Sequence, residues 1–75
     1  MNADATLDCL GFYCPMPIVM TQQKASSLSS GQTLEIIADD EGVKPDMKAW
    51  CERTGNELLE VEDTADGIRL LIRMG

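Results

Sequence analysis

Residues 7–20 read LDCLGFYCPMPIVM and mark the change from a strand to a helix. The run ATLDC, residues 5–9, alternates in polarity as a short β-strand does. Gly11 follows this run, and the two prolines beyond it each hold φ at about −65°, which suits a first helical turn. The stretch therefore predicts a strand, a loop that carries Cys14, and a helix that begins at the prolines.

The start of this first helix has two possible positions. A residue that precedes a proline is pushed away from helical geometry, which affects both Cys14 and Met16. Either Pro15 is the first helical residue, or Pro17 is first and Met16 is the cap; we favour the second. In both cases the Cys14 thiol lies within a turn of the helix N-terminus, whose partial positive charge favours the thiolate. We expect the helix to continue to Gly31.

The rest of the chain predicts a strand, a second helix and a closing hairpin. The run QTLEIIAD, residues 32–39, is rich in strand formers. After the turn DDEG, apolar residues recur at helical spacing from Val43 to Thr54, and Gly55 is a suitable stop for that helix. The runs NELLEVED and GIRLLIRM flank TADG and predict a β-hairpin.

This order, β-α-β-α-β-β, predicts an α+β fold in one domain, residues 1–75. A right-handed crossover makes the first two strands parallel and places their helix on one face of the sheet. With the second helix on that same face, the chain forms a two-layer α/β sandwich with a mixed four-stranded sheet. The other sheet face is then partly exposed, and Ile37 and Leu71 are candidates for an apolar patch on it.

The net charge argues against two kinds of function, binding to nucleic acid and binding to anionic membranes. Six basic residues against thirteen acidic ones give a formal charge of −7, which opposes non-specific binding to nucleic acid or anionic membranes. The same charge is compatible with docking onto a basic protein surface, and Arg69 and Arg73 are interpreted as solvated charges.

No apolar run approaches the length of a membrane span, and the first residues are polar, unlike a secretory signal. We expect a cytoplasmic protein that is monomeric when free.

Three cysteines and no histidine narrow the chemistry. An odd count without an export signal does not indicate a disulfide framework, and the spacing predicts neither a metal site nor a cofactor. Catalysis by Cys–His or Ser–His–Asp sites is excluded. Cys9 shares a strand face with Leu7, which favours core packing over a role as a resolving thiol. Cys51 lies on the apolar stripe of the second helix, which also favours the core.

Cys14 is the candidate functional residue. It follows the carboxyl end of a parallel strand, where functional groups collect in open α/β sheets. Asp39 and Asp40 follow the neighbouring strand, so we expect them on the same rim, where their charge opposes the effect of the helix N-terminus on the thiol. A presented thiol without a dedicated base suits a group that receives and gives away an atom under a partner's control. The alternative is a small, half-buried residue before a proline-started helix.

Four segments of the chain resemble a known protein family. The segments LDCLGFYCPMP, GQTLEIIADDEG, WCERTGNELLEVE and IRLLIR, in this order, resemble the TusA-like (SirA-like) sulfur-carrier family over nearly the whole chain. The signature of the family is Cys-Pro-x-Pro preceded by Asp and Gly. It is matched here by Asp8, Gly11, Cys14, Pro15 and Pro17.

The resemblance implies a β-α-β-α-β-β sandwich in which Cys14 carries sulfur as a persulfide. The sulfur comes from a cysteine desulfurase or a rhodanese-type donor, and family destinations are tRNA thiolation, molybdenum-cofactor assembly and sulfur oxidation. Asp39 and Asp40 match the acidic pair of the family. Tyr13 and Met16 depart from the charged or polar residues of many relatives, so the rim around Cys14 is more apolar and these two positions are candidates for partner choice.

Two other functions stay open at this level. One is a regulatory or binding module whose acidic surface, with Asp39 and Asp40, docks a basic partner. The other is a redox switch in which Cys9 and Cys14 form a disulfide. In the leading hypothesis the protein is a sulfurtransferase that acts as a carrier rather than as a self-sufficient enzyme.

Overall fold

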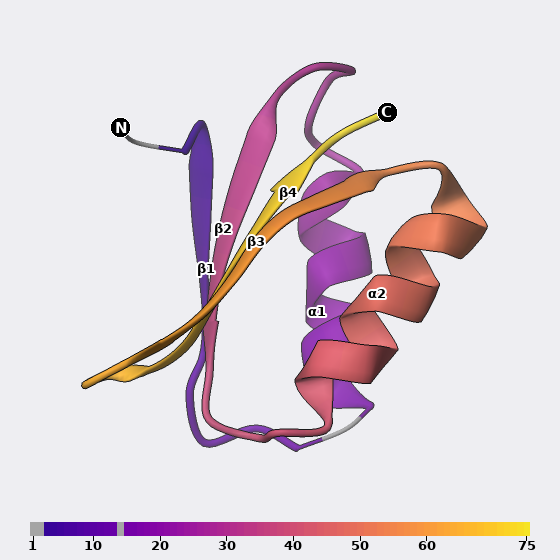
Figure 1. Ribbon diagram of the computed structural model, residues 1–75. Coiled ribbons are helices and arrows are strands. Elements are labelled where there is room, and N and C mark those ends of the chain that lie inside the picture. Colours follow the sequence, from indigo (N-terminus) through magenta and orange to yellow (C-terminus); the bar gives the residue numbers. More distant parts are fainter. Residues whose placement is uncertain (1–2, 14) are drawn as a thin grey trace.

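The computed structural model describes residues 3–13 and 15–75, and its elements follow the predicted order β-α-β-α-β-β (Figure 1). The expected α+β sandwich is confirmed. The elements are β1 (Ala5–Cys9), α1 (Met16–Ala25), β2 (Thr33–Ala38), α2 (Val43–Thr54), β3 (Glu57–Thr64) and β4 (Gly67–Arg73).

The four strands form one mixed sheet in the order β1-β2-β4-β3. β1 and β2 are parallel, with Cys9 opposite Ala38 at their carboxyl ends, while β4 runs antiparallel to both of its neighbours. Both helices cover the same face of this sheet, as Figure 1 shows. The right-handed crossover and the amphipathic second helix therefore produce the two layers that the sequence predicts.

The core lies between the helices and alternate residues of the strands. Along β2 the burial alternates, so that Leu34 and Ile36 are fully buried while the residues between them are half-buried. Met47 and Trp50 of α2 close the core from the other layer. Because a shift of register by one residue would expose this whole apolar set, the hydrophobic pattern fixes the pairing of the strands.

The start of α1 differs from both predicted positions. Met16 is the first helical residue, Pro15 is the N-cap, and Pro17 occupies the second position of the helix. The carbonyl of Pro15 accepts hydrogen bonds from the amides of Ile18 and Val19, both at 3.1 Å. Since the first amides of a helix have no helical partner, neither proline removes a hydrogen bond that the helix needs.

The end of α1 was predicted wrongly. The helix stops at Ala25 and not at Gly31. The Ser26 hydroxyl donates to the Gln23 carbonyl at 2.7 Å, and the Ser27 hydroxyl donates to the Lys24 carbonyl at 2.8 Å. Such local side-chain bonds offer the backbone an alternative to further helical turns.

No helix of the described residues, 3–13 and 15–75, covers the second face of the sheet (Figure 1). Ile37 and Leu71 lie half-buried on this face. Arg69 lies between neighbouring strands, and its side chain is only 22% exposed because it forms ion pairs with three glutamates. The interpretation of Arg69 as a simple solvated charge is therefore wrong. Arg73, half exposed, pairs with Glu57 across the β3–β4 hairpin.

Gly67 begins β4 at a position where a side chain has no room. Its φ is +140°, and a Cβ there would lie 2.6 Å from the carbonyl oxygen of Ala38. We expect Gly67→Ala to lower the free energy of unfolding by about 3 kcal/mol, from backbone strain and this clash. Gly31→Ala is the matched control, because Gly31 also has a positive φ but has open space around it.

In the control, the free energy of unfolding should fall by only about 1 kcal/mol, which is the penalty of a left-handed backbone alone. Urea unfolding followed by circular dichroism measures both values. Equal losses in the two variants would show that the close approach of Gly67 to β2 does not contribute to stability.

Candidate functional site

The loop of residues 10–13 leads from the carboxyl end of β1 towards α1. The predicted carrier residue, Cys14, lies outside the described residues. Its neighbours in the chain are described: Tyr13 ends the loop, and the backbone amide of Met16 donates a hydrogen bond to the Tyr13 carbonyl at 2.8 Å. This bond connects the end of the loop to the first residue of α1.

Two carboxylates hold this loop. Both oxygens of Asp39 accept the Gly11 amide, at 3.2 and 3.1 Å, so the end of β2 is connected directly to the loop after β1. Oδ1 of Asp8 accepts the Leu10 amide at 2.9 Å within its own turn. The carboxyl ends of the two parallel strands therefore share one rim, as expected, and Asp39 lies on it.

Asp40 has a structural contact of its own. Its Oδ1 accepts the Gly42 amide at 3.2 Å, and its carbonyl accepts the Val43 amide at 3.0 Å. These bonds shape the turn before α2. Partner docking by Asp39 and Asp40 stays a prediction, whereas both carboxylates take part in the structure of the loops.

Exposed apolar side chains surround the place of Cys14 in the sequence. Of the seven large apolar residues that are exposed in the described chain, five fall within residues 10–19, and Tyr13 is the most exposed of them at 72%. We call these five the apolar rim: Leu10, Phe12, Tyr13, Met16 and Val19. Exposed apolar groups mark an interaction surface where they form one patch, so these neighbours in the sequence are candidates for such a surface.

Only Tyr13 and Met16 of the apolar rim were predicted from the sequence as docking positions. Leu10, Phe12 and Val19 were missed. For Leu10 and Phe12 the available signal was the run LGFY, which lies in a loop and so has no strand or helix face to bury it.

The other two cysteines belong to the core, as predicted. Cys9 is fully buried, and burial, with a smaller effect of the Asp8 charge, raises the pKa of its thiol above the ordinary 9.0. Burial and the nearby Glu52 raise the pKa of Cys51 to about 11. Neither thiol forms a thiolate readily, so neither is suited to be a nucleophile.

The ionic groups near the start of α2 are paired. The Lys44 ammonium lies 3.0 Å from Asp63 and 3.1 Å from Glu41, and hydrogen bonds to these two carboxylates raise its pKa. Within residues 3–13 and 15–75, no group of three acidic, cysteine or histidine side chains is placed to hold a metal ion. No helix in these same ranges is long and apolar enough to cross a membrane.

Comparison with known proteins assigns the family. The model of the family described as sulfurtransferase TusA matches residues 5–74. The chain belongs to the TusA family. It is 44% identical over 75 residues to YrkI of Bacillus subtilis (strain 168), a protein named for a sulfur-carrier role, and the match covers all of both chains.

Two further comparisons concern a relative and a solved structure. The sulfur carrier protein TusA of Allochromatium vinosum is 39% identical over 70 residues, which cover 93% of this chain and 92% of that protein. The crystal structure of a SirA-like protein from Desulfitobacterium hafniense matches with a TM-score of 0.83 and 23% identity, covering 95% of this chain and 97% of the other. This structural match confirms the fold.

The contact between Asp39 and Gly11 can be tested by amide exchange. We expect Asp39→Ala to speed hydrogen exchange of the Gly11 amide by about tenfold, because a charge-assisted bond contributes about 1.5 kcal/mol. Asp39→Asn keeps one acceptor oxygen and should give a smaller change. Asp4→Ala, at the other end of β1, is the control and should leave Gly11 unaffected. An unchanged Gly11 rate in Asp39→Ala would contradict the role of this carboxylate in holding the loop.

Proposed function

We propose that this chain is a sulfur carrier that receives persulfide sulfur on Cys14 and passes it to an acceptor protein. The observation that carries the proposal is the CPMP motif, which follows the carboxyl end of β1 and lies inside the segment that matches the TusA family. Relatives with full-length matches carry names of sulfur carriers, which supports the same role here. The proposal treats residues 1–75 as one functional domain.

The transfer reaction balances without a redox reagent. The Cys14 thiolate attacks the outer sulfur of a donor persulfide, forms a new S–S bond, and breaks the S–S bond of the donor. The donor cysteine leaves with the electron pair as a thiolate. The outer sulfur keeps its hydrogen, so the product on the carrier is Cys14–S–SH. Attack by an acceptor nucleophile on that terminal sulfur then releases Cys14 as a thiolate.

The chain offers little acid–base chemistry of its own for these steps. It contains no histidine, and its other two thiols are buried with raised pKa values. A group of the donor or acceptor must therefore supply the base where one is needed. This requirement favours a carrier that works only in complex with a partner.

The apolar rim suits such a partner surface. Tyr13 is 72% exposed and Met16 is 43% exposed, and both lie within two positions of Cys14 in the chain. Burying them against a partner would remove apolar area from water and exclude water from the transferred sulfur. The donor in this proposal is a cysteine desulfurase or a rhodanese-type protein.

The acceptor is a protein of tRNA thiolation, molybdenum-cofactor assembly or sulfur oxidation. We place the carrier in the cytoplasm, where reducing conditions keep unpaired thiols reduced.

The two alternatives have less support. A Cys9–Cys14 redox switch needs a reactive second thiol, whereas Cys9 is fully buried and has a raised pKa. A docking module built on Asp39 and Asp40 needs presented carboxylates, whereas these two accept backbone amides in their loops. Sulfur transfer on Cys14 explains the motif without either requirement.

Mass spectrometry tests the carrier residue. After incubation with a cysteine desulfurase and L-cysteine, the intact protein should gain the mass of one sulfur atom, and dithiothreitol should remove it. Cys14→Ser should abolish the gain, because the attacking thiolate is absent. Cys9→Ala is the matched control and should keep the gain, provided that circular dichroism shows it folded. An adduct that persists in Cys14→Ser would assign the sulfur to another residue and contradict the proposal.

The apolar rim predicts a separable defect in docking. We expect Tyr13→Ala and Met16→Ala each to lower the second-order rate constant of sulfur loading from the donor protein by about tenfold. This is the effect of an interface hot spot of moderate strength. Loading from inorganic polysulfide, which needs no protein docking, should stay within about twofold of the wild type.

Leu59→Ala, on strand β3, removes an apolar side chain about as exposed as Met16 and should change neither rate. Equal defects with polysulfide and with the desulfurase would show that Tyr13 and Met16 act on the thiol itself and not on docking.

A further inference from the structure

The uncovered face of the sheet carries a groove that the proposed sulfur transfer does not use. Its volume is about 590 Å³, and it runs across β1, β2 and β4 to the β3–β4 turn. We call it the open-face groove; the lining residues that matter are Asp8, Leu10, Glu35, Ile37, Asp66 and Arg69. Its middle is apolar, since Ile37 lies in register between Asp8 on β1 and Arg69 on β4.

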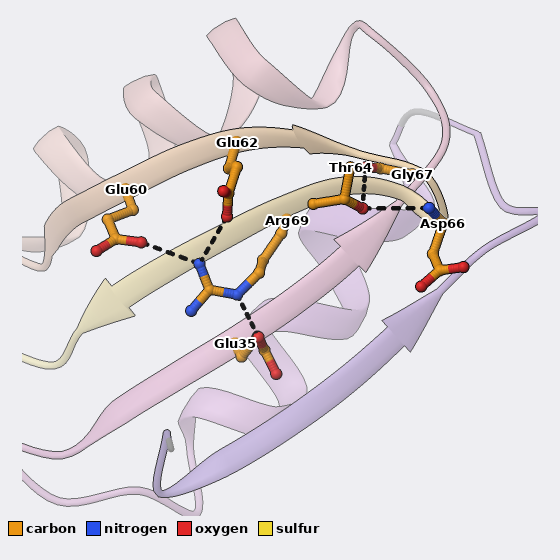
Figure 2. A network of polar contacts seen from close by, with 7 residues as sticks. All are labelled: Glu35, Glu60, Glu62, Thr64, Asp66, Gly67 and Arg69. Atoms are coloured by element: carbon orange, nitrogen blue, oxygen red, sulfur yellow. Dashed lines mark hydrogen bonds and ion pairs between the residues drawn. The ribbon is translucent and has the colours of Figure 1, made fainter. Parts of the chain in front are cut away.

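The cation of this groove is already neutralised. Arg69 donates from Nε to Glu35 and from Nη1 to Glu60 at 2.9 Å and to Glu62 at 3.4 Å, as Figure 2 shows. Three carboxylates from two neighbouring strands thus hold one guanidinium flat against the sheet. The charge of Arg69 is therefore more than offset by these carboxylates, which disfavours an additional anion in the groove.

The groove and its β3 edge keep an excess of negative charge. Asp8, Glu35, Glu60, Glu62 and Asp66 face one cation, Arg69. Asp66 lies in the β3–β4 turn, where its backbone amide donates to Thr64 Oγ1 at 3.2 Å (Figure 2). Its carboxylate forms no ion pair with the residues that the structure describes, so its charge is available to a ligand.

We propose that the open-face groove docks a basic, extended segment of a partner protein. An arginine or lysine side chain of the segment pairs with Asp66, and an aliphatic side chain beside it covers Ile37. Glu35 and Ile37, alternate residues of β2 that line the groove, have the spacing of alternate side chains in an extended segment. Charge complementarity makes the partner basic and excludes a second copy of this chain, whose net charge is −7.

The groove also leads towards the proposed transfer site. Leu10 lines the groove and belongs to the apolar rim, four positions before Cys14. A partner segment in the groove would therefore approach the loop of Cys14 from the sheet side. The inference rests on the proposed function only in supposing that this partner is a sulfur donor or acceptor.

Nuclear magnetic resonance with a defined peptide tests the docking. The probe is a short synthetic peptide in which arginine alternates with leucine and serine, added to the ¹⁵N-labelled protein. We expect the largest shifts at the amides of residues 6, 8, 35, 37, 66 and 69, and weaker binding at high salt, because the contacts are ionic. The same peptide with glutamate in place of arginine should not bind.

Charge variants at one exposed turn position make the test specific. Asp66→Asn should weaken binding by about threefold and Asp66→Lys by about tenfold, the range of exposed ion pairs. Glu52→Gln and Glu52→Lys change the net charge by the same amounts on α2 and should leave binding within about 1.5-fold. Equal losses at positions 52 and 66 would show attraction to net charge alone and overturn the site.

Other outcomes also decide the matter. Chemical-shift changes confined to residues 10–19 would place the docking on the apolar rim. Changes that follow protein concentration without peptide would indicate binding of a second copy of the chain. Either result overturns the inference. Absence of binding at low salt overturns it too. The sulfur transfer is judged separately, because Cys14→Ser should bind the peptide normally and Asp66→Lys should still gain sulfur from inorganic polysulfide.

Discussion

The parallel pairing of β1 and β2 is the constraint on which the candidate site depends. It brings the ends of two strands, Cys9 and Ala38, to the same edge of the sheet, so the loops that follow must lie side by side. Asp39 then reaches the Gly11 amide with both carboxylate oxygens. A small domain with a thin core gains a defined loop from this contact, since the ordered amide would otherwise lack a protein partner.

Side chains of β2 alternate between two faces of the sheet, the core face under the helices and the uncovered face. Leu34 and Ile36 point into the core under the helices, and Glu35 and Ile37 point to the uncovered face. Because both helices lie on the same face, no helix within residues 3–13 and 15–75 covers the other one (Figure 1). The ion pairs of Arg69 take the place of such a cover, since they bridge β2, β4 and β3 across the open face.

Sequence reasoning succeeded where local pattern decides structure. The helix Val43–Thr54 was predicted with its bounds because its apolar spacing is regular and Gly55 ends it in a left-handed conformation. The end of α1 was missed because two serine hydroxyls compete for backbone carbonyls after Ala25, which periodicity does not show. The role of Arg69 was missed because its partner Glu35 lies 34 positions away and meets it only through strand register.

A carrier must bind two partners in turn and release both, which favours several small surfaces over one large one. The apolar rim is suited to tight, water-excluding contact near the transferred atom, because apolar burial needs close packing. The acidic open-face groove acts at longer range and speeds encounter, while each exposed ion pair adds little to the lifetime of the complex. Separate surfaces of these two kinds allow fast association with a basic partner and fast release once the sulfur has moved.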